Sequence, residues 1–383
     1  MNGIYFDNAA TSFPKPPGVA EAVAEYISDI GANINRSSYA KAYDAESMVF
    51  ETRQLLCDMF NGGDLKNAVF TKNITESLNV ILKGLLKPGD HVITSSMEHN
   101  AVMRPLVQLE KAGVSFSRVP CTSQGKLILP ELEKALRDNT RAVVMTHASN
   151  VCGTVMPVKE VGEFCREHGL IFILDSAQTA GVLPIDMEQM NIDALCFTGH
   201  KGLLGPQGIG GFILKEHVIS QIEPLISGGT GSISHTEDVP SFMPDRFEAG
   251  TLNLPGIAGL NAPLKWIDNK GIDAIRNHEL KLTEMFVSGL EDMVANGLLR
   301  IVGLHNIGVI SVQTINKDLS EAALELEEKY KIMTRVGLHC APSAHKTLGT
   351  YPEGTIRFSF GWNNTEKEVE TAIEALRKIV REA

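Results

Sequence analysis

Two stretches in the middle of the chain decide the fold: Leu170-Ile-Phe-Ile-Leu-Asp-Ser-Ala-Gln178 and Ala194-Leu-Cys-Phe-Thr-Gly-His-Lys201. Each begins as a short apolar run, which is typical of a buried strand in a parallel sheet. Each then changes to polar residues, so the first run ends in Asp175 and the second leads to Lys201. Because ligands of open α/β sheets bind at the carboxyl ends of the strands, we expect these two side chains to share one site.

The segments around these stretches alternate between strand-like and helix-like patterns. This alternation predicts an α/β fold with a mostly parallel sheet covered by helices. Beyond residue 256 the pattern changes to long helices and short strands, which indicates a smaller α+β domain. We predict a large domain over 15–256 and a small C-terminal domain over 257–383 that takes in the N-terminal segment 1–14. The other expected strands lie near 67–71, 92–94, 141–146, 208–214, 308–312 and 356–359. Helices are expected to begin near 75, 101 and 159, and long helical segments to cover roughly 257–297, 319–332 and 365–381.

Composition narrows the class of protein. A chain of 383 residues is longer than one hydrophobic core usually serves, and its 35 basic and 46 acidic residues give a net charge of −11. This charge argues against a nucleic-acid partner. The sequence has no apolar run long enough for a membrane helix, and its N-terminus does not resemble a signal peptide. None of the six cysteines form a C-x-x-C pair, so we expect neither a metal site nor a redox dithiol, and a cytoplasmic location fits.

A carboxylate and a lysine at neighbouring strand ends are the two groups that pyridoxal phosphate (PLP) requires. The lysine forms a Schiff base with PLP, and the carboxylate pairs with the ring nitrogen so that the ring can act as an electron sink. Further polar residues follow other expected strands. Thr75 is placed to be a helix N-cap at a phosphate site, although plain capping explains it as well when it is taken alone. The remaining candidates are His99 against the ring, Asn150 and Gln178 at the phenolic oxygen, and Thr198 and His200 at the phosphate.

The last cluster of interest is Arg335-Val-Gly-Leu-His-Cys340-Ala-Pro342. A cysteine in a loop bounded by glycine and proline is a candidate thiolate nucleophile if the setting is exposed and electropositive. An inert loop cysteine is the alternative. Arg357 is a candidate clamp for a substrate carboxylate, and a surface strand arginine is its alternative. The Gly-rich loop after Lys201 lacks the Walker pattern, so a P-loop ATPase is disfavoured.

Taken together, these residues resemble the cysteine desulfurase branch of the class V aminotransferases and the closely similar selenocysteine lyases. The matching motifs run in order along nearly the whole chain: Tyr5-Phe-Asp-Asn8-Ala9-Ala-Thr11, Thr75-Glu76, Glu98-His99, Asn150, Asp175-x-x-Gln178, Thr198-Gly-His-Lys201, Arg246-Phe-Glu-Ala-Gly-Thr251, Gly337-x-His-Cys340 and Arg357.

The resemblance implies an aspartate-aminotransferase-like fold, a PLP cofactor and a role for each matching residue. Lys201 would hold PLP, Cys340 would form the persulfide, and Arg357 would bind the substrate carboxylate. The cofactor-binding set would be Thr75, Glu76, His99, Asn150, Asp175, Gln178, Thr198 and His200, with Thr251 reaching in from the second subunit of a homodimer; Asn8 and Ala9 would bind substrate.

The short loop around Cys340 resembles the family's second group, in which the cysteine lies close to the site and a sulfur-acceptor protein is often needed. One departure lies in Asn35-Arg-Ser-Ser-Tyr39, where relatives often have a histidine in place of Tyr39. We expect conversion of L-cysteine to L-alanine with a persulfide on Cys340. Selenocysteine lyase, another class V aminotransferase or β-lyase with an incidental Cys340, and a non-catalytic binding protein remain as alternatives.

Overall fold

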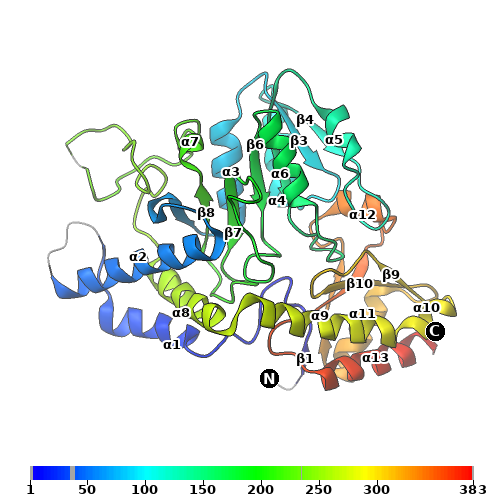
Figure 1. Ribbon diagram of the computed structural model, residues 1–383. Coiled ribbons are helices and arrows are strands. Elements are labelled where there is room, and N and C mark those ends of the chain that lie inside the picture. Colours follow the sequence, from blue (N-terminus) through cyan, green and yellow to red (C-terminus); the bar gives the residue numbers. More distant parts are fainter. Residues whose placement is uncertain (1–2, 35–38, 234, 382–383) are drawn as a thin grey trace.

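A seven-stranded sheet forms the centre of the structure, a computed structural model that describes residues 3–34, 39–233 and 235–381 (Figure 1). Its strands are β2 (Ala68–Thr71), β3 (His91–Ser95), β4 (Ser115–Val119), β5 (Thr140–Thr146), β6 (Ile171–Asp175), β7 (Ala194–Thr198) and β8 (Gly210–Leu214). They lie in the order β2-β8-β7-β6-β5-β3-β4. The five strands from β3 to β7 pair in parallel, and β8 and β2 pair antiparallel at one edge. This confirms the prediction of an α/β fold with a mostly parallel sheet.

The strand order reverses at β3. From β3 the chain forms β4 on one side and then crosses to form β5 on the other. Such a reversal opens a crevice beyond the carboxyl ends of the two strands, because the loops that follow them leave in opposite directions. The segments after β3 and β5 therefore flank the natural binding crevice of this sheet.

Alternate strand residues pack into two separate cores. Val143 and Phe172 face one core, which is covered by α2 (Ala40–Phe60), α6 (Val158–Glu167) and α8 (Leu254–Lys270). Their neighbours Val144 and Ile173 face the other core, under α3 (Ile74–Leu85), α4 (Asn100–Glu110) and α7 (Glu216–Ile219). A strand buried on both faces reads as a continuous apolar run, which is why the β6 and β7 sequences predict the fold. Two short helices, α1 (Val19–Glu25) and α5 (Pro130–Ala135), complete this part of the chain.

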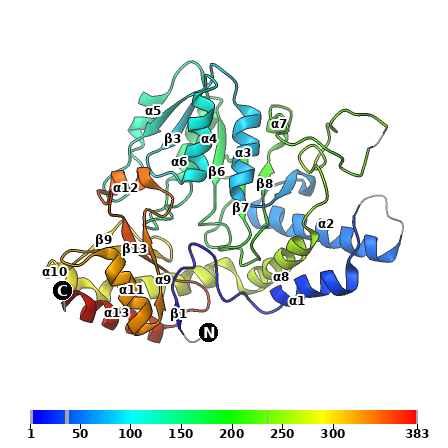
Figure 2. The ribbon, with the colours of Figure 1, turned by 180° about the vertical axis from the view of Figure 1, so that it is seen from behind.

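The C-terminal part builds a second, antiparallel sheet in the order β12-β13-β10-β9. These strands are β9 (Leu299–Val302), β10 (Val309–Thr314), β12 (Arg335–Gly337) and β13 (Thr355–Ser359), and the helices of this part are α9 (Ile272–Gly289), α10 (Glu291–Ala295), α11 (Leu319–Tyr330), α12 (Pro342–Leu348) and α13 (Glu366–Arg381). The N-terminal strand β1 (Ile4–Tyr5) pairs with β11 (Ile332–Met333), so the start of the chain lies among its last elements (Figure 2).

The boundary predicted at residues 256 and 257 stays a prediction. It falls inside the first turn of α8, which begins at Leu254, packs against α1 and α2 and contributes to the core of the large sheet. The sequence-based prediction lacks five strands, which are β1, β4, β9, β11 and β12. Of these, β4 lies at a sheet edge, where Ser115, Ser117 and Arg118 interrupt the apolar pattern. No helix over the described residues is both long and apolar enough to cross a membrane.

Candidate active site

The carboxyl ends of β6 and β7 carry the predicted carboxylate and lysine. Asp175 is the last residue of β6 and is only 2 % exposed, and the backbone N–H of Ala177 donates to its Oδ1 at 2.9 Å. Burial lowers the pKa of Lys201 to about 8, while the Asp175 carboxylate opposes that shift. Burial likewise raises the pKa of Asp175, and Lys201 opposes this. The structure thus brings both groups into one buried site.

Two buried polar atoms near Lys201 have no hydrogen-bond partner among the described residues: Thr198 Oγ1 and His200 Nδ1. Burial lowers the pKa of His200 to about 4, with Lys201 and Lys15 adding to the effect, so its ring is neutral at physiological pH. Buried polar atoms are normally satisfied in folded proteins. Two orphaned atoms beside a buried lysine therefore fit a site whose ligand supplies the missing hydrogen-bonding groups.

Helix α3, which follows β2, has Asn73 as its N-cap. The expectation from the sequence that Thr75 is the N-cap is therefore wrong. Asn73 has extended backbone angles, and its side chain accepts from the N–H of Glu76 at 3.0 Å. The Glu76 carboxylate in turn accepts from the N–H of Lys72 at 2.6 Å, so it closes the turn before the helix. Thr75 lies exposed in the first helical turn, where N–H groups lack intrahelical partners. That position still suits an anion-binding role.

His99 follows β3 and forms the N-cap of α4. Its Nδ1 accepts from the N–H of Ala101 at 3.0 Å, so in the neutral ring the proton is on Nε2. Burial, with Lys201 and nearby arginines adding to it, lowers the pKa of His99 to about 4. A neutral ring held in one orientation at the switch point is suited to lie against a flat ligand.

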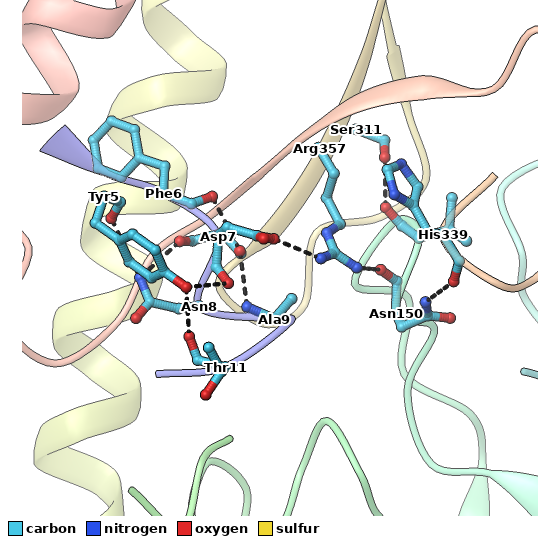
Figure 3. A network of polar contacts seen from close by, with 12 residues as sticks. Tyr5, Phe6, Asp7, Asn8, Ala9, Thr11, Asn150, Ser311, His339 and Arg357 are labelled. Atoms are coloured by element: carbon cyan, nitrogen blue, oxygen red, sulfur yellow. Dashed lines mark hydrogen bonds and ion pairs between the residues drawn. The ribbon is translucent and has the colours of Figure 1, made fainter. Parts of the chain in front are cut away.

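Arg357 is a buried arginine that pairs with the N-terminal segment (Figure 3). It lies on β13, is 2 % exposed, and its guanidinium donates to Asp7 Oδ1 at 2.8 Å and to the carbonyl oxygen of Asn150 at 2.9 Å. Its Nε has no hydrogen-bond partner in the described part of the chain. Burial excludes the alternative of a surface strand arginine. The pairing with Asp7 has no local sequence signal, because the two residues are 350 positions apart.

The other N-terminal residues expected in the site are engaged in holding the chain together. Asn8 Nδ2 donates to the carbonyl oxygen of Ser359 at 3.0 Å and to Asn364 Oδ1 at 3.1 Å, which uses both of its N–H groups. The carbonyl oxygen of Ala9 accepts from Gln178 Nε2 at 3.1 Å. Asn8 and Ala9 nevertheless line a small cavity together with Gln178 and Lys201, and their contact with substrate stays a prediction.

Cys340 lies exposed in the loop between β12 and α12. The loop is held at the switch point by two hydrogen bonds: the N–H of Asn100 donates to the Cys340 carbonyl oxygen at 2.8 Å, and Asn150 Nδ2 donates to the His339 carbonyl oxygen at 2.7 Å. His339 and Cys340 have φ values of 47° and 58°, in the left-handed region that residues other than glycine rarely occupy. Two such residues in succession indicate a loop conformation imposed by its surroundings.

His339 is positioned as a neutral donor and not as a base. The Ser311 hydroxyl donates to the Val151 carbonyl oxygen at 2.6 Å, so its oxygen must accept from Thr355 at 2.8 Å. The Thr355 oxygen then accepts from His339 Nε2 at 3.0 Å, which leaves Nδ1 without a proton and, over the residues that the structure describes, without a partner. Burial, reinforced by Arg357, lowers the pKa of His339 to about 2. The positive charge near Cys340 therefore comes from Arg357. Arg335, which the sequence gives only as part of the loop cluster with no role, also acts on the site, because it lowers the pKa of Lys201 and His99.

Thr251 and Tyr39 lie apart from these residues. Thr251 is exposed and lines a cavity of about 210 Å³ together with Thr71 at the end of β2, Lys72 after it, and Glu76 in the first turn of α3. Its contribution to a neighbouring subunit stays a prediction. Tyr39 is 52 % exposed at the start of α2, and residues 35–38 of the same motif lie outside the described residues.

Comparisons with known proteins agree with this arrangement. Residues 4–371 match the family model of the class V aminotransferases. A probable cysteine desulfurase from Pyrococcus abyssi is 36 % identical over 99 % of this chain and 94 % of its own length. One from Methanothermobacter thermautotrophicus is 34 % identical over 98 % of this chain and 94 % of its own length.

Solved structures give the same result. The apo cysteine desulfurase from Thermococcus onnurineus superposes with a TM-score of 0.92 at 33 % identity, covering 100 % of this chain and 95 % of that one. A cysteine desulfurase from Escherichia coli, in the S-sulfonic acid form, gives a TM-score of 0.88 at 27 % identity and covers 99 % and 95 % of the two chains. The chain therefore belongs to the class V aminotransferase family, in which it groups with the cysteine desulfurases.

Proposed function

We propose that this protein is a PLP-dependent cysteine desulfurase that removes the sulfur of L-cysteine, releases L-alanine and holds the sulfur as a persulfide on Cys340. The position of the Cys340 loop supports this most strongly. Its backbone is hydrogen-bonded to Asn100 and to Asn150, which follow the two strands at the switch point, while the cysteine itself is exposed. An incidental cysteine would not need a strained loop held at this crevice from both sides.

The residues at the strand ends fit PLP. Asp175 would accept the ring N–H, His99 would lie against the ring, and Gln178 and Asn150 would face the phenolic oxygen. The orphaned atoms Thr198 Oγ1 and His200 Nδ1 would bind the phosphate together with Thr75 in the first turn of α3. When bound, PLP supplies the electron sink that chemistry at the substrate α-carbon requires.

Lys201 would hold PLP and move a proton at the substrate α-carbon. An ordinary lysine is almost entirely protonated at neutral pH, whereas a lysine whose pKa is lowered to about 8 presents a usable fraction of neutral amine. Arg357 would orient the substrate through its carboxylate, since a guanidinium offers paired donors to two oxygens. In this arrangement Asp7 keeps the buried guanidinium paired when no substrate is bound.

The sulfur transfer balances without an external oxidant. The Cys340 thiolate attacks the sulfur of the bound substrate, and the new S–S bond forms as the substrate Cβ–S bond breaks. The electron pair of the broken bond stays on carbon, which takes up a proton to become the methyl group of alanine. The exposure of Cys340 leaves the transferred sulfur accessible to an acceptor protein, which we include in the proposal.

The test supplies L-cysteine to the PLP-loaded protein and measures alanine together with the mass of each cysteine peptide. We expect alanine in the wild type, one extra sulfur on the Cys340 peptide, and loss of both in Cys340→Ser and Lys201→Ala. Cys121→Ser, at a half-buried cysteine elsewhere, is the control and should behave as the wild type. Extra sulfur on another cysteine would contradict the nucleophile. Alanine formation from L-selenocysteine alone, unchanged in Cys340→Ser, would identify a selenocysteine lyase instead.

A further inference from the structure

One backbone oxygen in the site receives an unusual number of hydrogen bonds. The carbonyl oxygen of His200 accepts from the Ser12 N–H at 2.9 Å, the Lys15 ammonium at 3.0 Å, and the hydroxyls of Thr11 and Ser12 at 3.2 Å each. A carbonyl oxygen has two lone pairs, so four donors exceed the number that a peptide group ordinarily accepts. This oxygen belongs to the peptide group that joins His200 to Lys201.

All four donors come from one short stretch of the N-terminal segment, Thr11 to Lys15. Lys15 holds the stretch together, because its ammonium also donates to the Ser12 hydroxyl at 2.8 Å. Within the described residues, no carboxylate lies within ion-pair distance of Lys15, so its charge is directed at the backbone. A charged donor makes a shorter and stronger hydrogen bond than a neutral one. Lys15 is the one donor of the four that can carry a charge.

The same segment contacts the site at two further points. Asp7 pairs with Arg357 at 2.8 Å, and the carbonyl oxygen of Ala9 accepts from Gln178 at 3.1 Å. The segment is thus fixed directly before the stretch that contacts His200. Because the peptide plane before a residue sets where its side chain begins, an anchored His200 carbonyl restricts the direction in which Lys201 enters the site.

We propose that Lys15 is a positioning residue for Lys201: together with Thr11 and Ser12 it fixes the peptide between His200 and Lys201 and so aligns the lysine amine for reaction. The proposal rests on the assignment of Lys201 as the cofactor lysine. Lys15 touches neither substrate nor cofactor in this role. A reacting amine must be held close to its ideal direction, since a displacement of about 1 Å can cost on the order of 100-fold in rate.

The test measures how fast the apoprotein forms its covalent linkage with PLP, from the growth of the visible absorbance and from borohydride trapping on Lys201. Lys15→Met is compared with Lys15→Arg, which keeps a charged donor, and with Lys134→Met, which removes an exposed lysine elsewhere. We expect Lys15→Met to slow the linkage on the order of 10- to 100-fold. We expect Lys15→Arg to recover most of the rate and Lys134→Met to match the wild type. Thr11→Val, which removes a neutral donor, should slow the linkage with PLP less than Lys15→Met does.

Turnover of L-cysteine gives the second measurement. Lys15→Met should lower kcat by a similar factor and leave the KM for L-cysteine within about twofold, because binding through Arg357 is untouched. Equal linkage rates in Lys15→Met and Lys134→Met would overturn the proposal. A loss of apoprotein stability in Lys15→Met that fully accounts for the slower linkage, with no recovery in Lys15→Arg, would also overturn it. A wild type that forms the linkage but makes no alanine would contradict the desulfurase proposal and leave this comparison valid.

Discussion

At the scale of single residues, the site histidines are neutral. Burial lowers the pKa of His99 and His200 to about 4 and that of His339 to about 2. Each ring therefore acts through the position of its one proton, which for His99 and His339 is Nε2. Lys201 differs from these three rings, because its pKa is lowered only to about 8 and it can therefore titrate near neutral pH.

The pKa of Lys201 predicts a pH dependence for the apoprotein. A protonated lysine cannot attack PLP, so the rate of linkage should rise as the pH increases through about 8 and level off above it. The measurement is the rate constant for the absorbance change at pH values on both sides of this midpoint. A midpoint near 10.5, the ordinary value for lysine, would show that burial does not tune Lys201.

The residues of the site divide into those with a local sequence signal and those without one. Asp175 and Lys201 directly follow apolar runs, so a strand pattern and a polar end predict their meeting. The pairing of Arg357 with Asp7 and the contact of Lys15 with His200 join segments far apart in the chain. No local pattern encodes such contacts, because they depend on how the two sheets are placed against each other.

At the scale of elements, helix capping and anion binding at the start of α3 belong to two different residues, although the sequence suggests Thr75 for both. Asn73 caps the helix, whereas Thr75 lies in its first turn with no part in the cap. Thr and Asn both favour helix starts, so composition alone does not tell the cap from a ligand two residues later.

Two substitutions test this separation. Asn73→Ala should lower the free energy of unfolding of the apoprotein by about 1 kcal/mol, because the cap is lost. Thr75→Val should leave that free energy nearly unchanged and weaken PLP binding. Urea unfolding of the apoprotein and PLP titration measure the two effects. A Thr75→Val protein that is less stable than Asn73→Ala would show that Thr75, and not Asn73, is the N-cap of α3.

Helix α9 carries a buried acid that makes stability depend on pH. Glu279 is 8 % exposed, lines a cavity of about 40 Å³ with Lys201 and Gln178, and burial raises its pKa to about 8. No hydrogen bond to its carboxyl group is found among the described residues. The folded state therefore keeps this proton between pH 4.5, the ordinary value, and about 8, while the unfolded state loses it.

Stability should consequently fall as the pH rises through that window, because the unfolded state binds fewer protons. The glutamine in Glu279→Gln cannot ionise. The free energy of unfolding of this variant should therefore rise relative to that of the wild type by roughly 1 kcal/mol per pH unit across the window. Glu284→Gln, on the exposed side of the same helix, is the matched control for the loss of one carboxylate. Urea unfolding at several pH values gives both comparisons. A flat difference for Glu279→Gln would mean that Glu279 does not titrate in this range.

At the scale of the whole molecule, exposed apolar side chains gather near the N-terminal helices. Tyr43 and Phe50 on α2 are 55 % and 57 % exposed. Phe50 and Thr251 both line a cavity of about 430 Å³ between α2 and the segment after α7. Together with the expected role of Thr251, this surface favours a homodimer, since twofold contacts are the commonest oligomeric arrangement.

Subunit mixing tests the shared site. If Thr251 acts on the neighbouring subunit, a heterodimer of Lys201→Ala and Thr251→Val has one site with both lesions and one with neither. Two inactive preparations should then regain activity when mixed, up to about half that of a wild-type dimer. Subunit exchange is followed by native mass spectrometry. A monomer at working concentration, or proven exchange without recovered activity, would contradict the composite site.

The hydrogen bonds of the N-terminal segment also determine which parts of the site can form first while the chain is being synthesised. Asp7 and Ala9 find their partners Arg357 and Ser359 across 350 positions, so these contacts form only after nearly the whole chain has left the ribosome. Asp175 and Lys201 emerge much earlier, and Cys340 comes between them and β13. The carboxyl ends of β6 and β7 can thus fold before the Cys340 thiol and the Arg357 guanidinium have been synthesised. A nascent chain therefore lacks the pair of Asp7 with Arg357 until β13 has been made.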